Sequence, residues 1–398
     1  MAFIETLRTK PEWKRHLWLI SLTFPTTPLL GIALALATGN PHWVWLPVAI
    51  FYVLVPALDY FVGDDKYDLL GLIQDEVSRS KFYKFMVHAM LPAIYLTWVG
   101  GAWFFTKQSW PWDVYLALGL SHGWGLAFAI NAGHETGHKT DKVSKWFALF
   151  MLLPSFYGHF RVEHNMGHHS DVATPRDHAT SRFGESYYQF MSREYPGAWK
   201  RSWKIEKRRA DRKGYSRFSL KNEVVLATDM ALILWSVMIV IFGVSVLAYM
   251  LLAWFVSATA LTSQNYIAHY GLLRDRRPDG KFLPCEPHHS WNCNLLVTNL
   301  TSFNLARHSD HHANPSRHYQ YLRQFQEVPA LPFGYMLMFL IGYVPPLFRR
   351  VMDPLVLKGV NGDMNKVLTK DLVCQWEAEQ SVVKPEANKA STRNSASV

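Results

Sequence analysis

Half of the 18 histidines in this chain lie in four short clusters whose spacing suits a metal site. The clusters are His134-Glu-Thr-Gly-His138, Glu163-His-Asn-Met-Gly-His-His169, Asn265-Tyr-Ile-Ala-His-Tyr-Gly271 and Arg307-His-Ser-Asp-His-His312. Histidines four positions apart lie on one face of a helix, so both imidazoles of such a pair can reach one metal ion. The second and fourth clusters add an adjacent histidine that can turn toward a second ion. The candidate ligands are His134, His138, His164, His168, His169, His269, His308, His311 and His312.

The ligand types indicate two iron ions. Nine imidazoles exceed the four to six ligands that a first-row metal takes, so the site needs two ions. The three cysteines, Cys285, Cys293 and Cys374, lie outside the clusters and form no Cys-x-x-Cys pair, which argues against copper(I), iron–sulfur and four-cysteine sites. Zinc would fit histidine ligands but cannot change its redox state. A pair of nitrogen-rich sites at an apolar edge favours iron and O2 chemistry.

Four carboxylates stand in or near the clusters. A metal-bound imidazole needs its second nitrogen oriented by a carboxylate or a carbonyl. The candidates for this role are Glu135, Glu163, Asp310 and Glu286. The alternative interpretation is that they are solvated side chains around the site.

Long apolar runs must position these clusters. Hydrophobic residues make up 49% of the chain, and they gather into runs of about 20, the length that crosses a bilayer core. A single run of this kind could be a buried core helix, but six runs with almost no charge predict an all-α integral membrane protein. Gly243 is the expected turn between the last two. The six predicted transmembrane helices are Leu17–Ala37, Val44–Val62, Phe85–Phe105, Trp112–Asn131, Val224–Phe242 and Gly243–Ser263.

The cations predict the orientation. With the N-terminus inside, the outer loops carry only Lys107, so 40 of the 41 lysines and arginines lie on the inner side. The positive-inside rule makes that side cytoplasmic, and it explains the net charge of +10 without nucleic acid. The fourth and sixth spans then both end inside, each on a histidine, and all nine candidate ligands share one depth.

The rest of the chain is predicted to form a helical cap and a tail. Residues 134–223 and 269–381 should make a cytoplasmic cap that holds the metal site, within a single membrane domain of residues 1–381. Residues 382–398 are rich in Ser, Lys, Asn and Ala, which is typical of a disordered tail. The apolar segment Leu331–Phe348, interrupted by glycine and proline, is expected to be a helix lying in the membrane interface.

Two charged features allow more than one interpretation. Asp59 lies near the inner end of an apolar span, where a carboxylate is costly; it has either a functional role or a place at the headgroups. The segment Lys200–Arg217 carries nine cations against two acids. These cations either follow the positive-inside rule or bind an acidic electron carrier.

The histidine clusters resemble those of the bacterial membrane-bound alkane 1-monooxygenases. The likeness runs from about Leu17 to Pro354. Paired histidines are shared with membrane fatty-acid desaturases and hydroxylases and with xylene-type monooxygenases. The His-Tyr-Gly271 element and the long pattern Arg307-His-Ser-Asp-His-His-Ala-Asn-Pro-x-Arg-x-Tyr-Gln320 favour the alkane enzymes.

The resemblance implies a di-iron centre with all nine histidines as ligands. It implies O2-dependent terminal hydroxylation of medium-chain n-alkanes in the bacterial inner membrane, with electrons from a rubredoxin and its reductase. The chain lacks the four cysteines of a fused rubredoxin, so the donor should be separate. Two residues depart from the family pattern: Ala268 replaces an expected acid, and His178 has no counterpart.

Two rival functions stay open from the sequence. A desaturase or fatty-acid hydroxylase would bind an acyl chain with a polar head. A metal transporter would need a polar path through the spans, which hold few charges besides Asp59 and Asp229.

Overall fold

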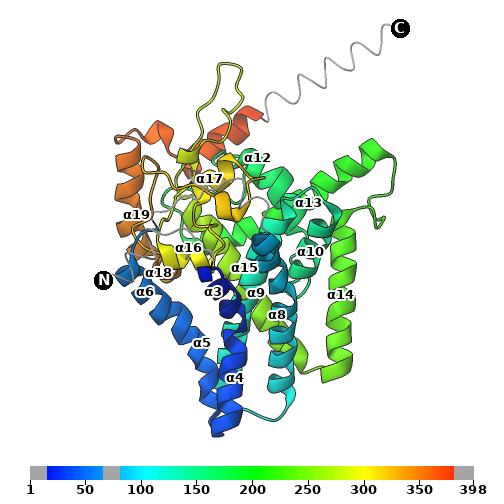
Figure 1. Ribbon diagram of the computed structural model, residues 1–398. Helices are drawn as coiled ribbons and strands as arrows, with labels where there is room; N and C mark the ends of the chain where they lie inside the picture. Colours follow the sequence, from blue (N-terminus) through cyan, green and yellow to red (C-terminus); the bar gives the residue numbers. More distant parts are fainter. Residues whose placement is uncertain (1–15, 66–80, 381–398) are drawn as a thin grey trace.

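The computed structural model describes residues 16–65 and 81–380 (Figure 1). Within these two ranges the chain folds into helices and loops, and β pairing is limited to isolated bridges. The predicted all-α fold is therefore confirmed. The tail predicted for residues 382–398 lies outside the described residues.

Five helices are long and apolar enough to cross a membrane. The first, Leu19–Thr38, comprises α3 (Leu19–Thr23), η1 (Phe24–Thr26) and α4 (Thr27–Thr38), and the second, Pro41–Val62, comprises η2 (Pro41–Trp45), α5 (Leu46–Ala49), η3 (Ile50–Leu54) and α6 (Val55–Val62). The others are α8 (Lys81–Thr106), α14 (Glu223–Phe242) and α15 (Val246–Ala268). They correspond to five of the six predicted spans, and Gly243 ends α14 with a positive φ of 81°, as the predicted turn requires.

The remaining predicted span is α9 (Trp112–Gly137), which is as long as α8 but less apolar than the five. Most of its residues are buried in the middle of the bundle, so its surface does not need to match lipid. The count of six spans stays a prediction.

Small residues let α9 lie close against α15. A Cβ at Gly119 would come within 2.1 Å of the Leu252 side chain, and one at Gly123 within 2.4 Å of Val256. Glycines spaced four apart allow two helix backbones to approach closely. This contact holds the His134 end of α9 beside the His269 end of α15.

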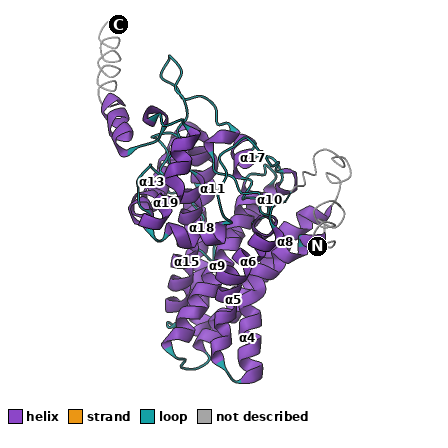
Figure 2. Cartoon of the chain, turned by 90° about the vertical axis from the view of Figure 1, so that its left-hand side faces the viewer, coloured by secondary structure: helices purple, strands orange, loops and turns teal. Residues whose placement is uncertain are grey.

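The remaining helices cover the end of the bundle where α9 and α15 finish, and we call this region the cap (Figure 2). The longest is α13, which begins with a capping box between Ser186 and Gln189 and ends at Gly214. The cap also contains α10 (Lys142–Leu152), α11 (Phe160–Glu163), η5 (His164–His168), α12 (His169–Asp171), α13 (Tyr187–Lys213), η6 (Pro287–His289), α16 (Leu296–Thr301), α17 (His308–Ala313), η7 (Tyr319–Tyr321), α18 (Tyr335–Gly342), α19 (Pro345–Gly359) and η8 (Met364–Lys366).

The segment Leu331–Phe348 differs from the predicted interfacial helix. It forms the eight-residue α18 and the start of α19, which are separated where the prolines at 345 and 346 begin the second helix. Met338 and Phe339 are buried, and α18 packs against α15. The segment is therefore two helices and not one, because the prolines end the first. Leu340, Val344 and Leu347 are exposed, and the position of the segment in the membrane interface stays a prediction.

Two buried acids, one in the second long helix and one just after it, attach this helix to the cap. Asp59 accepts hydrogen bonds from the backbone N–H of Thr298 at 2.9 Å and from its hydroxyl at 2.6 Å. Asp65 pairs with Arg307 at 2.9 Å, and both side chains are almost fully buried. Asp59 therefore has a protein partner in α16, and Arg307 precedes the histidines of α17.

Candidate metal centre

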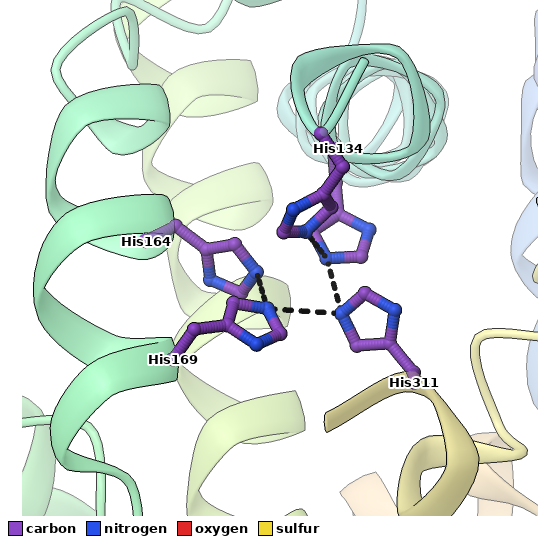
Figure 3. Close-up of side chains that lie close together, drawn as sticks. His134, His164, His169 and His311 are labelled. Carbon is purple, nitrogen blue, oxygen red and sulfur yellow. Dashed lines mark hydrogen bonds between the residues drawn. The ribbon is translucent and has the colours of Figure 1, made fainter. Parts of the chain in front are cut away.

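All nine clustered histidines meet in the cap and form two groups. In the first group, the ligand atoms of five histidines lie within 4.8 Å of one another; these are His134, His138, His164, His169 and His311 (Figure 3). In the second group, His168, His269 and His312 satisfy the same criterion. His308 joins the second group, because its Nε2 lies 3.1 Å from His269 Nε2 and 3.0 Å from His312 Nε2.

Hydrogen bonding alone does not explain the first group. His134 Nε2 lies 3.1 Å from His138 Nε2 and 3.0 Å from His311 Nε2, and His169 Nε2 lies 3.1 Å from His311 and 3.0 Å from His164. Each imidazole nitrogen offers either one proton or one lone pair in the ring plane. Five nitrogens can therefore form at most two paired hydrogen bonds. A cation at their centre would use all five lone pairs at once.

The distances fit the edges of a metal coordination shell. Two nitrogens that each lie about 2.1 Å from one ion, at right angles, are separated by about 3.0 Å. The six Nε2–Nε2 contacts of the two groups measure 3.0–3.1 Å. In the second group, His168 Nε2 is buried and has no hydrogen-bond partner. The donor set therefore fits two metal ions.

The imidazoles are held in the form that binds metal. Burial, and then the neighbouring imidazoles, lower the pKa of four cap histidines well below the usual value: His164, His169, His311 and His312. A low pKa keeps a ring neutral at physiological pH, so its lone pair is available to a metal.

A π-helical turn changes which histidines of the second cluster act together. The sequence spacing predicted that His164 and His168 would face one ion. Instead, η5 has a wider turn, in which the N–H of His169 donates to the carbonyl of His164. His164 and His169, five positions apart, therefore share the first group, and His168 points to the second.

The α17 helix divides its histidines by ordinary α-helical spacing. His308 and His312 lie four apart and reach the second group, while His311 reaches the first. The neighbouring pairs His168–His169 and His311–His312 therefore each serve both groups, as the sequence led us to expect of adjacent histidines.

A carboxylate that the sequence did not single out holds one of the rings. His168 Nδ1 donates to Asp177 Oδ2 at 2.9 Å, and both side chains are buried. Burial raises the pKa of Asp177, but His168 and Arg201 and a hydrogen bond from Thr180 hold it below its ordinary value. Asp177 is nine residues beyond His168 in an irregular turn, so no helical spacing marks it.

Two of the predicted carboxylates make polar contacts next to the ligands. Glu135 pairs with Lys139 at 3.0 Å and accepts from the N–H of Tyr319 at 3.4 Å. Asp310 binds Arg317 at 2.7 Å and Arg323 at 2.9 Å. Both therefore stabilise the segments that carry the clustered histidines.

The other two carboxylates lie in contrasting surroundings. Glu163 is buried, with its nearest cation, Arg201, at 3.6 Å. Burial, and then Asp177, raise the pKa of Glu163 well above its ordinary value. Glu286 is exposed beside His288 at 3.5 Å. Among the described residues, none of the four predicted carboxylates has a hydrogen bond to a clustered histidine.

An apolar cavity adjoins both histidine groups. Its wall includes His134, His164 and His308 at one part and the aromatic side chains Trp124 and Phe339 at another. Trp124 precedes His134 by ten residues on α9, so the cavity extends about 15 Å along that helix.

Comparisons with known proteins agree on the family. The sequence profile described as fatty acid desaturase matches residues 108–342, which include all nine clustered histidines. An alkane 1-monooxygenase from Pseudomonas putida is 41% identical over 92% of this chain and 92% of its own length. Alkane 1-monooxygenase 1 from Alcanivorax borkumensis is 42% identical over 89% of this chain and 88% of its own.

A relative with a different substrate in its name is less similar. The hydroxylase component of a xylene/toluene monooxygenase from Pseudomonas putida is 28% identical over 55% of this chain and 58% of its own length. The matches to the alkane enzymes extend over about nine-tenths of the chain, so they include both the spans and the cap. The match to the desaturase profile includes all four histidine clusters. This chain belongs to the alkane 1-monooxygenase family of oxidoreductases.

Proposed function

We propose that this protein converts medium-chain n-alkanes to 1-alkanols with O2 at two histidine-held iron ions, using electrons from a separate rubredoxin and its reductase. The observation that carries this proposal is the apolar cavity whose wall includes His134, His164 and His308. The names of the relatives that cover about nine-tenths of the chain support the same reaction.

The overall reaction consumes the alkane, O2, two electrons and two protons, and it yields the alkanol and water. The nine histidines would hold the irons, which supply O2 activation when bound. A terminal C–H bond has no polar group that the protein could bind, so selectivity depends on how the protein positions the end of the alkane. The cavity along α9 can hold an extended alkyl chain with its end toward His134 and its length toward Trp124.

The cavity argues against the acyl alternative. Besides the three histidines, its lining contains apolar, amide and hydroxyl side chains, and among the described residues it contains no lysine or arginine. A site for a fatty acid or a carrier-linked acyl chain needs a partner for a charged head group. An uncharged hydrocarbon fits this lining without leaving a buried charge unpaired.

We place the protein in the bacterial inner membrane, with its cap and both termini in the cytoplasm. The five apolar helices support a multi-pass membrane protein, and the cations on the cap side support this orientation. The cytoplasm also supplies a rubredoxin and its reductase at the same face.

The test is product analysis with the purified protein in lipid nanodiscs, together with rubredoxin, its reductase and octane. We expect 1-octanol and two irons per chain. His138→Ala should lose iron and activity, because His138 belongs to the first group, whereas His288→Ala should keep both, because His288 is exposed outside the two groups. Unchanged iron and activity in His138→Ala, or preference for an acyl substrate, would contradict the proposal.

A further inference from the structure

We propose that a polar cavity on the cap side, distinct from the apolar cavity, is the docking site for a small one-electron carrier with an acidic face. This inference rests on the proposed function, because the hydroxylation needs two electrons that the alkane does not supply. It assigns the point at which those electrons enter the chain.

The cavity connects the protein surface with one ligand of the first group. Its lining includes the exposed side chains of Lys81 and Lys84 at the start of α8. Its lining also includes His138, which is less buried than His134 on the same helix. His138 Nε2 lies 3.1 Å from His134 Nε2, so a carrier docked over the opening of this cavity is separated from the first group by the lining that includes His138.

The charges around this cavity favour an acidic partner. Of its two carboxylates, Glu135 is paired with Lys139 at 3.0 Å, and Asp141 accepts from the backbone N–H of Ser144 at 3.0 Å at the start of α10. The three lysines of the lining, Lys81, Lys84 and Lys139, outnumber the two carboxylates, so the exposed Lys81 and Lys84 leave the rim with a net positive charge. A cleft rimmed by one sign of charge attracts a partner of the opposite sign.

The two cavities have different chemistry and reach different ligands. The apolar cavity contacts His134, His164 and His308, and the polar cavity contacts His138. A carrier docked at the polar cavity therefore leaves the hydrocarbon route open, and both can be used within one catalytic cycle.

The basic stretch of α13 is the competing site, and the structure weakens its case. Arg201 is turned inward to Glu163 and Asp171, and Arg209 binds Glu206 and Glu223. Arg201 and Arg209 are therefore engaged within the cap. The other seven cations of residues 200–217 are exposed, but none of them lines the cavity that reaches His138.

The experiment compares two charge reversals of equal size. Lys81→Glu with Lys84→Glu changes the rim, and Lys204→Glu with Arg208→Glu changes two exposed cations of α13. The first readout is the affinity of each protein in nanodiscs for zinc-substituted rubredoxin, which binds without transferring electrons. The second is the rate at which reduced rubredoxin is oxidised by the protein, measured by stopped-flow absorbance at low and at high salt.

At low salt, we expect the rim variant to bind rubredoxin about ten-fold more weakly than the parent and to oxidise it about ten-fold more slowly. The difference should be smaller at high salt, because salt screens the electrostatic attraction between the two proteins. The α13 variant should match the parent, and both should keep their iron. Equal binding by the rim variant and the parent, or a larger loss in the α13 variant, would overturn the docking site. A parent that binds rubredoxin but makes no octanol would instead count against the proposed function.

Discussion

The contact between His168 and Asp177 allows a sharp test of the two-ion arrangement. We consider Asp177→Asn, which keeps the size of the side chain but removes its charge. In the structure, Asp177 accepts from His168 at 2.9 Å and from the Thr180 hydroxyl at 2.6 Å, without solvent access. The amide can still face His168 with its oxygen, so the ring keeps its place but loses its charged partner. The effect should fall on the second group alone.

The expected size follows from how such partners act elsewhere. Removing a carboxylate that orients a metal-bound histidine weakens metal affinity by about 10–100-fold. This factor equals about 1.4–2.7 kcal/mol of binding free energy. One of two irons should therefore be released to a chelator faster or at lower chelator concentration, while the other is unaffected. Two kinetic phases of release, of which only one changes, would identify the second group.

The matched control is Asp171→Asn. Asp171 also contacts Arg201, as Asp177 does, but has no hydrogen bond to a clustered histidine. We expect this variant to retain both irons like the parent in the same chelator titration, read by elemental analysis. If Asp177→Asn holds both irons as tightly as the parent, the reasoning fails. If both variants lose iron equally, the effect passes through Arg201 and the role of Asp177 is refuted.

Three further outcomes can be checked. Phe339→Ala should lengthen the preferred alkane and Ala260→Phe should shorten it, because both residues line the apolar cavity; product profiles from a mixture of alkanes would measure this. Gly123→Ala should lower the Tm, because its Cβ would lie 2.4 Å from α15, whereas Gly125→Ala, with 3.6 Å to its nearest neighbour, should be tolerated. Burial raises the pKa of Glu194 from 4.5 to about 8, so folding binds a proton between these values and stability falls as pH rises through them; Tm measured from pH 5 to pH 8 should fall less in Glu194→Gln.

Much of the fold could be predicted from the apolar runs and from the residues that begin and end helices. The boundaries of α14 agree with the sequence to within one residue, because Asn222 caps its start and Gly243 ends it. The other ends differ by up to six residues; α9 continues through His134 to Gly137, because burial in the bundle lets a helix extend with polar residues. Apolarity predicts where a helix meets lipid, and it says little about a helix that other helices surround.

The membership of the site could be predicted, but its division into two groups could not. Histidine counts and spacing indicated the nine residues that the structure brings together. His164 and His169 share the first group because of a π-helical turn, and no residue type in the sequence predicts such a turn. The contact between Asp177 and His168 depends on the fold of the irregular segment between them, so the spacing of the two residues does not predict it.

The π-helical turn at His164–His168 also has a consequence for how this chain tolerates change. A π-helical turn holds one residue more than an α-helical turn, so deleting one residue between His164 and His168 would leave an ordinary α-helical turn. His164 and His169 would then lie four positions apart, and their side chains would still share one face. We therefore expect related chains to tolerate a one-residue gap inside this turn, whereas a gap in an ordinary α-helical turn would rotate the rest of the helix by about 100°.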